Sequence, residues 1–382
     1  MLSAVSRGMY GSMYILRRQS LVELLLLIAG IGAHPRVALG QLPAAQGAPK
    51  AASDAQVAAL VKQASARMAQ GQLALAETLL ERARSLAPHN ELVLKSLAKL
   101  QSRLGELPAA VDIFRQIVAA EPASPDAHLN LAIALADSGD QKEALEQATA
   151  AEELGPQLAA PHLNRARILD DLHRPEEAKP EFETACHLAP TNGDCYFYWA
   201  LLEREEGDYA SESSLLERVV FLQPHNDKAY YLLGRSYAYQ SLPEKAVQAW
   251  RKALALNPNY KEAAYSLARA MRKSNPAEAR IYEQRFNAIR ENGDRVEQVK
   301  LLGNQAVAAM SREDWPGAIV IFRQALTLCG GCEAEADLHK DMGLALCHAG
   351  EIEEGTKELH IALSLDPGNL DVVKALQIVE PR

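Results

Sequence analysis

Aromatic residues are scarce in this 382-residue sequence, since Phe, Trp and Tyr together make up only 5% of it. Much of its 48% hydrophobic content is alanine, and small residues let helices pack closely. Basic residues are also in the minority, because 40 Lys and Arg face 49 Asp and Glu, giving a net charge of −9. Binding to a phosphate backbone needs a basic face, so the composition argues against nucleic acid as a partner.

The sequence also lacks the motifs of common catalytic sites. It contains no nucleophile elbow, no H-E-x-x-H and no phosphate-binding glycine loop. Its ten histidines are scattered, and a catalytic or metal site needs clustered partners. We therefore expect no enzymatic activity and no cofactor.

A hydrophobic run long enough for a membrane span is missing near the N-terminus. The segment "LVELLLLIAGIGA" (21–33) contains Glu23 and falls short of the ~20 apolar residues that span a bilayer. Arg17 and Arg18 precede it, and Ala38-Leu39-Gly40 follows as a small-x-small cleavage site. Residues 1–40 are predicted to be a secretory signal, which makes the mature chain periplasmic or secreted, without an integral membrane span.

Three details of this segment leave alternatives open. An uncleaved anchor is one, and twin-arginine export is another, although Ser20 stands where that signal prefers an apolar residue. Met13 is an alternative start that would give the signal ordinary proportions. Cleavage would remove four arginines and Glu23, a net +3, so the mature charge would be −9 − 3 = −12. Residues 41–55, rich in Ala, Pro and Gly, are predicted to form a flexible linker.

Prolines, in contrast, recur with a regular spacing. They lie 34 residues apart, at 88, 122, 156, 190, 224 and 258. Proline removes a backbone donor and keeps its predecessor out of the α region, so each one predicts the end of a helix. When the proline is numbered 32, repeat units begin at 57, 91, 125, 159, 193 and 227. A 34-residue period of this kind indicates stacked helix pairs.

Small residues occupy three further positions of the unit. Positions 8, 20 and 27 are mostly small, as in Ala166, Ala178 and Ala185. Position 15 is often glycine, which can cap the first helix in the left-handed conformation. Asparagine or serine follows the proline in several units and can cap the next helix; these residues are Asn90, Ser124, Asn192 and Asn226.

This pattern resembles the tetratricopeptide repeat family across most of residues 57–369. The resemblance implies an all-α fold: a right-handed superhelical solenoid of antiparallel helix pairs, whose first helices line a concave groove. About nine units are expected, with further units at 261–294, 299–332 and 336–369, and residues 370–382 as a capping helix and tail. The unit at 261–294 is degenerate or contains a register break, because Arg280, Gln284 and Asn287 occupy positions 20, 24 and 27.

The resemblance also implies which side chains face the groove, at positions 2, 5, 9, 12 and 13 of each first helix. The sixth and seventh units place a basic, tyrosine-rich set there: Lys228, Tyr231, Arg235, Tyr239, Tyr265, Arg269, Arg272 and Lys273. Tyrosine and arginine dominate binding hot spots, so we predict a peptide-binding face. A solvated face of ordinary helix-forming residues is the alternative.

A second predicted groove feature is asparagine at position 6, in Asn130 and Asn164. In the superhelix of O-linked N-acetylglucosamine transferase, such asparagines bind peptide backbone, and Lys95 and Lys99 lie beside them here. The carboxylate clamp of chaperone-binding relatives is matched only by Lys95 and Asn130, so we do not predict that clamp.

Cysteines suggest two further features. Cys186 and Cys195 flank one interhelical loop, and we predict Cα atoms within the ~4.4–6.8 Å that a disulfide requires. The motif "CGGC" (329–332) is a C-x-x-C, but no histidine follows Cys332, which argues against covalent haem. In an exported chain we expect a structural disulfide or unpaired thiols at this motif. Zinc held by these two thiols with Cys347 and His348 is a further alternative.

The sequence therefore supports three hypotheses. The first is an exported scaffold or adaptor that binds a protein or peptide, acidic or carboxylate-terminated, in its groove. The second is a redox or metal-binding factor that uses the C-x-x-C at 329–332. The third is a purely structural component of the cell envelope.

Overall fold

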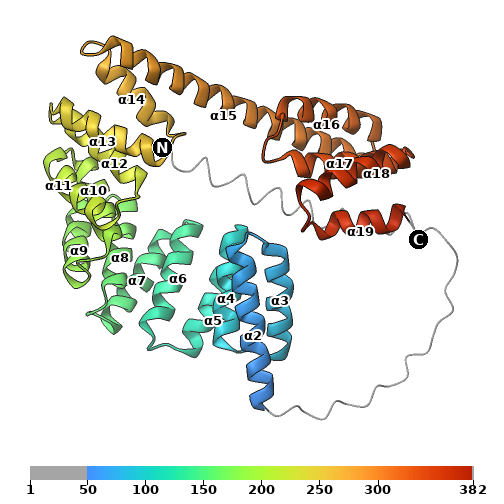
Figure 1. Cartoon of the computed structure of the whole chain (residues 1–382). Helices are drawn as coiled ribbons and strands as arrows, with labels where there is room; N and C mark the ends of the chain where they lie inside the picture. Colours follow the sequence, from blue (N-terminus) through green and yellow to red (C-terminus); the bar gives the residue numbers. More distant parts are fainter. Residues whose placement is uncertain (1–49, 381–382) are drawn as a thin grey trace. The chain divides into compact units, whose positions relative to one another are not determined.

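The structure is a computed structural model that describes residues 50–380, and every regular element in this range is a helix (Figure 1). The predicted signal at 1–40 lies outside the described residues. The chain divides into two compact units, one ending at Gln240 and the other beginning at Ser241, and each is described separately.

Helices of the first unit pack consecutively as pairs, each second helix returning beside the first. The eleven helices are α2 (Lys50–Ala69), α3 (Leu73–Leu86), α4 (Glu91–Leu104), α5 (Leu107–Ala120), α6 (Pro125–Ser138), α7 (Gln141–Leu154), α8 (Ala159–Asp171), α9 (Pro175–Leu188), α10 (Gly193–Glu206), α11 (Tyr209–Leu222) and α12 (Asp227–Tyr239). Helix α2 begins inside the predicted 41–55 linker, which is a correction, because residues 50–55 are helical.

Helix boundaries follow the repeated prolines and caps. Helices α3, α5, α7, α9 and α11 each end two residues before a position-32 proline, as predicted. The predicted caps are also confirmed, since the side chains of Asn90, Ser124, Asn192 and Asn226 each accept a bond from a backbone N–H of the first turn. Position-15 glycines adopt the left-handed conformation, with φ of 75° at Gly71 and 80° at Gly105.

The core follows the small positions of the repeat. In the first six repeats every residue at positions 8, 20 and 27 is buried, including Ala166, Ala178 and Ala185. Large side chains fill the space beside them, such as Phe182, which is fully buried. Close helix crossing and side-chain packing between neighbouring pairs therefore hold each unit together.

Helices of the second unit include one of unusual length. They are α13 (Pro243–Leu256), α14 (Lys261–Met271), α15 (Pro276–Met310), α16 (Trp315–Cys329), α17 (Glu335–His348), α18 (Ile352–Leu365) and α19 (Leu370–Val379). The 35-residue α15 packs on α14 at one end and on α16 at the other. It therefore supplies the second helix of the unit at 261–294 and the first helix of the unit at 299–332, without a loop between them.

The start of α15 also explains the degenerate unit. Ala279 is buried against α14, whereas Arg280, at the position expected to be small, is exposed. The buried face has thus shifted by one residue, which is the register break that the sequence left open. No helix among residues 50–380 combines the length and the apolar character needed to cross a membrane.

Candidate functional site

The predicted first-helix residues of the second unit gather at a pocket between α14 and α15. Tyr265, Arg269 and Arg272 line this cavity of about 310 Å³, together with Arg280 and Phe286 from α15. The rings of Tyr265 and Phe286 lie 5.4 Å apart at 50°. We call this cavity the α14–α15 pocket. Its two walls bring aromatic and cationic groups together.

Lys273 does not join this pocket. Helix α14 ends at Met271, and Arg272 is its C-cap residue, which still lines the pocket. Lys273 lies in the following turn, where its side chain is exposed, and it is not part of the lining. The predicted residues that line the pocket are therefore Tyr265 and Arg269 on α14 and Arg272 at its C-terminal cap.

The predicted residues on α12 lie in the first unit. The guanidinium of Arg235 is 6.0 Å from the centre of the Tyr231 ring, and Lys228 is exposed. Tyr239 is 58% exposed and stacks on Tyr209 of α11, with ring centres 4.3 Å apart. This tyrosine pair presents a flat apolar surface. The residues predicted to form one patch on α12 and α14 therefore belong to two different compact units.

The polar residues predicted nearer the N-terminus are largely engaged within their own helices. Lys95 pairs with Glu91 one turn earlier, and this hydrogen bond raises the pKa of the lysine. The amides of Asn130 and Asn164 donate to backbone carbonyls of Asp126 (2.7 Å) and Ala160 (2.9 Å). Lys99 remains exposed.

A cation–aromatic contact beside Asn164 was not predicted. The Arg167 guanidinium lies 4.4 Å from the centre of the Tyr198 ring and also donates to the Asn164 side chain at 3.3 Å. Further along α8, burial raises the pKa of Asp170 to about 6, aided by the negative charges of Glu205 and Asp171. The period placed Arg167 and Asp170 at positions 9 and 12, so the signal was available.

Histidines at position 4 join the two helices of a pair. Their Nδ1 atoms bond to the acceptor at position 23, with His128 to Gln147 at 2.8 Å and His162 to Glu181 at 2.7 Å. The Nε2 atom of His162 also lies 3.1 Å from the carbonyl of Pro156, the proline of the preceding repeat. Histidine at position 4 therefore connects successive repeats as well as packing within one.

The environment of His162 does not fit a metal ion, although Glu152, His162 and Glu181 lie close together. Burial lowers the pKa of His162, but the bonds to Glu181 and Pro156 outweigh it and raise the pKa. Both ring nitrogens face acceptors, an arrangement that favours the protonated imidazolium, in which both nitrogens donate. Arg165 bridges Glu152 at 3.1 Å and Glu181 at 2.5 Å, so both carboxylates already face a cation and are poorly suited to hold a metal ion.

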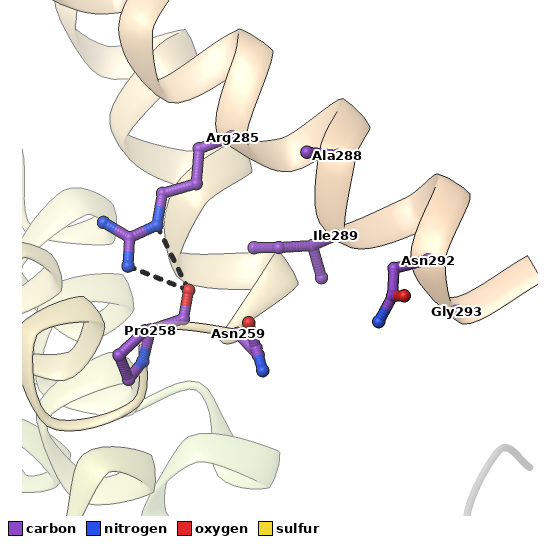
Figure 2. A pocket seen from close by; sticks show the side chains of 7 residues that line it. All are labelled: Pro258, Asn259, Arg285, Ala288, Ile289, Asn292 and Gly293. Carbon is purple, nitrogen blue, oxygen red and sulfur yellow. Dashed lines mark hydrogen bonds between the residues drawn. The ribbon is translucent and has the colours of Figure 1, made fainter. Parts of the chain in front are cut away.

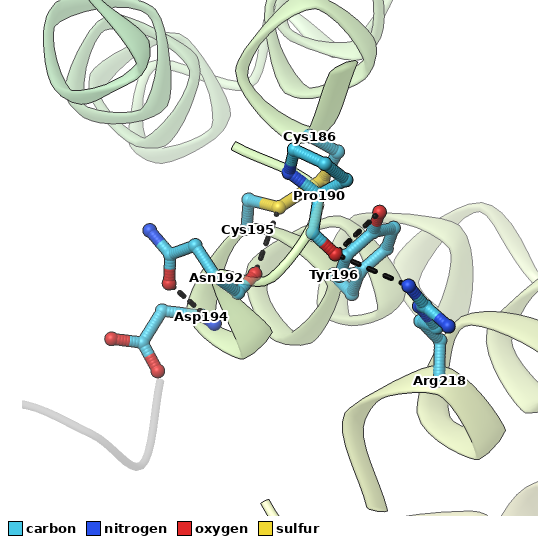
Figure 3. The surroundings of a disulfide bond; sticks show 7 residues. All are labelled: Cys186, Pro190, Asn192, Asp194, Cys195, Tyr196 and Arg218. Carbon is cyan, nitrogen blue, oxygen red and sulfur yellow. Dashed lines mark hydrogen bonds between the residues drawn. A yellow bond between two sulfur atoms is a disulfide. The ribbon is translucent and has the colours of Figure 1, made fainter. Parts of the chain in front are cut away.

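Cys186 and Cys195 are joined as a disulfide between α9 and α10 (Figure 3). Their Cα atoms are 5.5 Å apart, inside the predicted range, and both residues are buried. The carbonyl of Pro190, in the loop that the disulfide closes, accepts from Tyr196 at 3.4 Å and Arg218 at 3.3 Å. The disulfide and these bonds fix the same interhelical loop.

The C-x-x-C motif forms a structural disulfide rather than an accessible pair of thiols. Cys329 and Cys332 form a disulfide at the C-terminal end of α16, and Cys329 is only 1% exposed. A helix C-terminus disfavours a thiolate, and a reactive thiol needs access. The Sγ atom of Cys347 lies near Gly355, and His348 stacks on Trp315 at 4.5 Å. Within residues 50–380 these two residues and the C-x-x-C do not form a group whose ligand atoms could share a metal ion.

A second cavity, of about 510 Å³, lies between the turn before α14 and the middle of α15 (Figure 2). Its only cationic side chain, Arg285, donates two bonds of 3.1 and 2.9 Å to the carbonyl of Pro258. The remaining lining includes Ala288 and Ile289. Because its cation is satisfied, this cavity offers less for recognition than the α14–α15 pocket.

Comparison with known proteins identifies the repeat. Models of the tetratricopeptide repeat match residues 67–128 and 227–260, so the chain carries tetratricopeptide repeats at both places. No curated protein matches the chain in sequence.

Several solved structures of helical repeat proteins are similar to parts of the chain. A tetratricopeptide repeat protein from Parabacteroides merdae is 15% identical, covering 76% of this chain and 99% of its own, with a TM-score of 0.45. MamA from Desulfovibrio magneticus is 21% identical, with coverage of 44% and 93% and a TM-score of 0.40. YrrB, described as having an unusual peptide-binding site, is 21% identical, with coverage of 48% and 95% and a TM-score of 0.38.

Proposed function

We propose that this tetratricopeptide repeat protein is an exported scaffold that binds an acidic or carboxylate-terminated peptide segment of a partner protein through its first helices. One observation carries the proposal. On α14, Tyr265 is 50% exposed and stands beside the exposed guanidinium groups of Arg269 and Arg272. Among residues 50–380 neither arginine forms an ion pair, so both charges are available to a partner.

The charge balance of the chain favours an acidic partner. Exposed, unpaired arginines in a protein of net charge −9 attract acidic peptides, while the remaining surface repels them. Tyrosine adds rigid apolar contact at low entropic cost, and a second exposed tyrosine, Tyr239, lies on α12. The same combination supports a binding role over a purely structural one.

The redox alternative receives less support. It required thiols that are exposed and flanked by basic groups, but Cys329 is buried at the C-terminal end of its helix. That environment suits a structural disulfide that stabilises the turn after the helix.

Charge reversal on α14 tests the proposed function. We expect Arg269→Glu combined with Arg272→Glu to weaken binding of the native partner more than about tenfold, because each hot-spot residue contributes about 2 kcal/mol. The partner would be identified by crosslinking in cells and mass spectrometry, and its affinity measured with purified proteins. The loss should shrink at high salt, where charge attraction is screened.

The matched control is Lys300→Glu combined with Arg312→Glu, which makes the same charge change at exposed sites in the same unit. It should leave the affinity for the partner within about twofold of the wild-type value, since exposed charges away from the site contribute little to binding. Equal weakening by both double variants would show a general charge effect and refute the assignment to α14.

A further inference from the structure

The degenerate repeat has an open helix junction where the others are closed. Positions 8, 20 and 27 hold Ala268, Arg280 and Asn287 here, and none of the three is buried. In the first six repeats all residues at these positions are buried. The one-residue shift of α15 places Ala279 against α14 and turns Arg280 outward. The junction thereby opens into the α14–α15 pocket of about 310 Å³.

The pocket has an excess of positive charge. Arg269 and Arg272 approach from α14 and Arg280 from α15, whereas Glu283 is the only carboxylate in the lining. Within the described part of the chain, none of the three arginines is ion-paired. Three cations and one anion leave a net charge of about +2, which a dianion would neutralise more fully than a single carboxylate.

The other walls are apolar and aromatic. Tyr265 and Phe286, with ring centres 5.4 Å apart, stand at the pocket with Ala268 and Ala279. Such walls suit a flat apolar stem, because aromatic rings pack at offset or edge-to-face geometries. The ligand that matches both features carries its dianion on an aromatic stem.

We propose that the α14–α15 pocket binds a phosphate monoester on an aromatic stem. A phosphoryl group carries a charge of about −1.5 to −2 at pH 7 and three strong acceptor oxygens, and arginine binds it with paired N–H donors. Arg269, Arg272 and Arg280 can each serve one face of this group, while Tyr265 and Phe286 pack against the stem. The site goes beyond the proposed peptide binding and does not depend on it.

Calorimetry on the full-length mature protein with phenyl phosphate as the probe tests the site. Phenyl sulfate has the same shape with one negative charge, and inorganic phosphate lacks the stem. We expect phenyl phosphate to bind about tenfold more tightly than either one, and its binding to weaken as pH falls below about 6, where the phosphate gains a proton.

Arg280→Gln is the decisive variant, because Arg280 lies outside the first-helix face used for the proposed function. It should weaken phenyl phosphate about tenfold, as expected when a charged hydrogen-bonding group is lost. Arg295→Gln, the same change on the exposed middle of α15, should leave binding unchanged. Equal affinity for phenyl phosphate and phenyl sulfate, or equal effects of the two substitutions, would overturn the proposal.

A phosphotyrosyl peptide distinguishes two sources of the same chemistry. Binding at least as tight as phenyl phosphate would assign the site to a phosphorylated side chain, and much weaker binding would assign it to a free small molecule. Failure of all phosphate probes, together with retained partner binding that is sensitive to Arg269→Glu and Arg272→Glu, would reject this pocket and leave the peptide-binding proposal intact.

Discussion

Glu212 is the residue most at odds with its position in the repeat. It occupies position 20, where five of the first six units have alanine, and it is only 1% exposed. Burial raises the pKa of its carboxyl, and the opposing effects of Arg204, Ser236 and Arg235 are smaller. Ionised Glu212 therefore destabilises the fold, because a buried charge loses its hydration.

We expect Glu212→Gln to raise the free energy of unfolding at pH 7 by on the order of 1 kcal/mol. The unfolded carboxyl ionises at its ordinary pKa and the folded one only at higher pH. The wild type therefore loses stability as pH rises between those two values, and the glutamine variant does not. Urea unfolding of both proteins from pH 4 to pH 8 measures the difference, which should vanish near pH 4.

Glu153→Gln provides the control, since Glu153 is exposed and its replacement should shift stability equally little at every pH. Parallel curves for wild type and Glu212→Gln across the whole range would show that the buried carboxyl does not titrate within it.

Residues of the candidate site were partly predictable. The period placed Tyr265, Arg269 and Arg272 on one helix face, and the structure brings them to one pocket. Arg280 stood out as a departure from the pattern, but its direction depends on how α15 is rotated against α14. That rotation is set by packing between helices, which the sequence period alone does not give.

Helices α17 and α18 show how closely two helices can approach when small residues lie where they cross. Gly343 and Gly355 occupy positions 8 and 20 of the last repeat. A Cβ atom at Gly355 would lie 2.7 Å from the backbone oxygen of Gly343 and 2.6 Å from Sγ of Cys347. A backbone atom cannot move aside as a flexible side chain can, so this crossing tolerates only glycine.

We predict that Gly355→Ala destabilises the protein by about 1–3 kcal/mol through overpacking. Gly293→Ala, in the exposed middle of α15, should instead stabilise it by up to about 1 kcal/mol, because alanine is the better helix former and its Cβ would meet nothing within 4 Å. Thermal unfolding of both variants would test the pair. Two shifts of the same sign would refute the close crossing.

The length of α15 has a local cause. The unit at 261–294 has Asn292 at position 32, where seven other units have the proline that ends their second helix. Without that proline nothing forces a stop, and the helix runs on to Met310. The sequence showed the missing proline, but a short loop remained equally compatible with it, because the absence of a helix stop does not by itself specify a helix.

At the scale of the whole molecule, the 34-residue period predicted the individual repeats but not the division of the chain into two compact units. The helix pairs from residue 57 to residue 260 follow it, yet the division at Gln240 and Ser241 falls inside the sixth repeat. Ser241 has a left-handed φ of 60° where several other repeats have glycine. Repeat proteins are held by neighbour contacts, so their subdivision depends on interface strength, which a periodic pattern does not reveal.

The cysteines provide a prediction about the whole chain and its compartment. Four of the five are paired, with Cα separations of 5.5 Å for Cys186 and Cys195 and 5.0 Å for Cys329 and Cys332, and Cys347 is free. If residues 1–40 direct export, both pairs meet an oxidising environment, where disulfides persist. Protein isolated from its native host without reductant, then denatured and alkylated, should show one reactive thiol per chain.

Cys347→Ser should lower that count to zero. A variant without residues 1–40, which keeps all five cysteines and stays in the reducing cytosol, should show five reactive thiols. Denaturation before alkylation matters, because burial raises the pKa of the Cys347 thiol and slows its reaction in the folded chain. Five thiols in protein from the native host would contradict both the export proposal and the two disulfides in the cell. A count of three thiols would mean that only one of the two disulfides forms in the cell. Peptide mapping would then show which pair is reduced, and the structural role would be limited to the other pair.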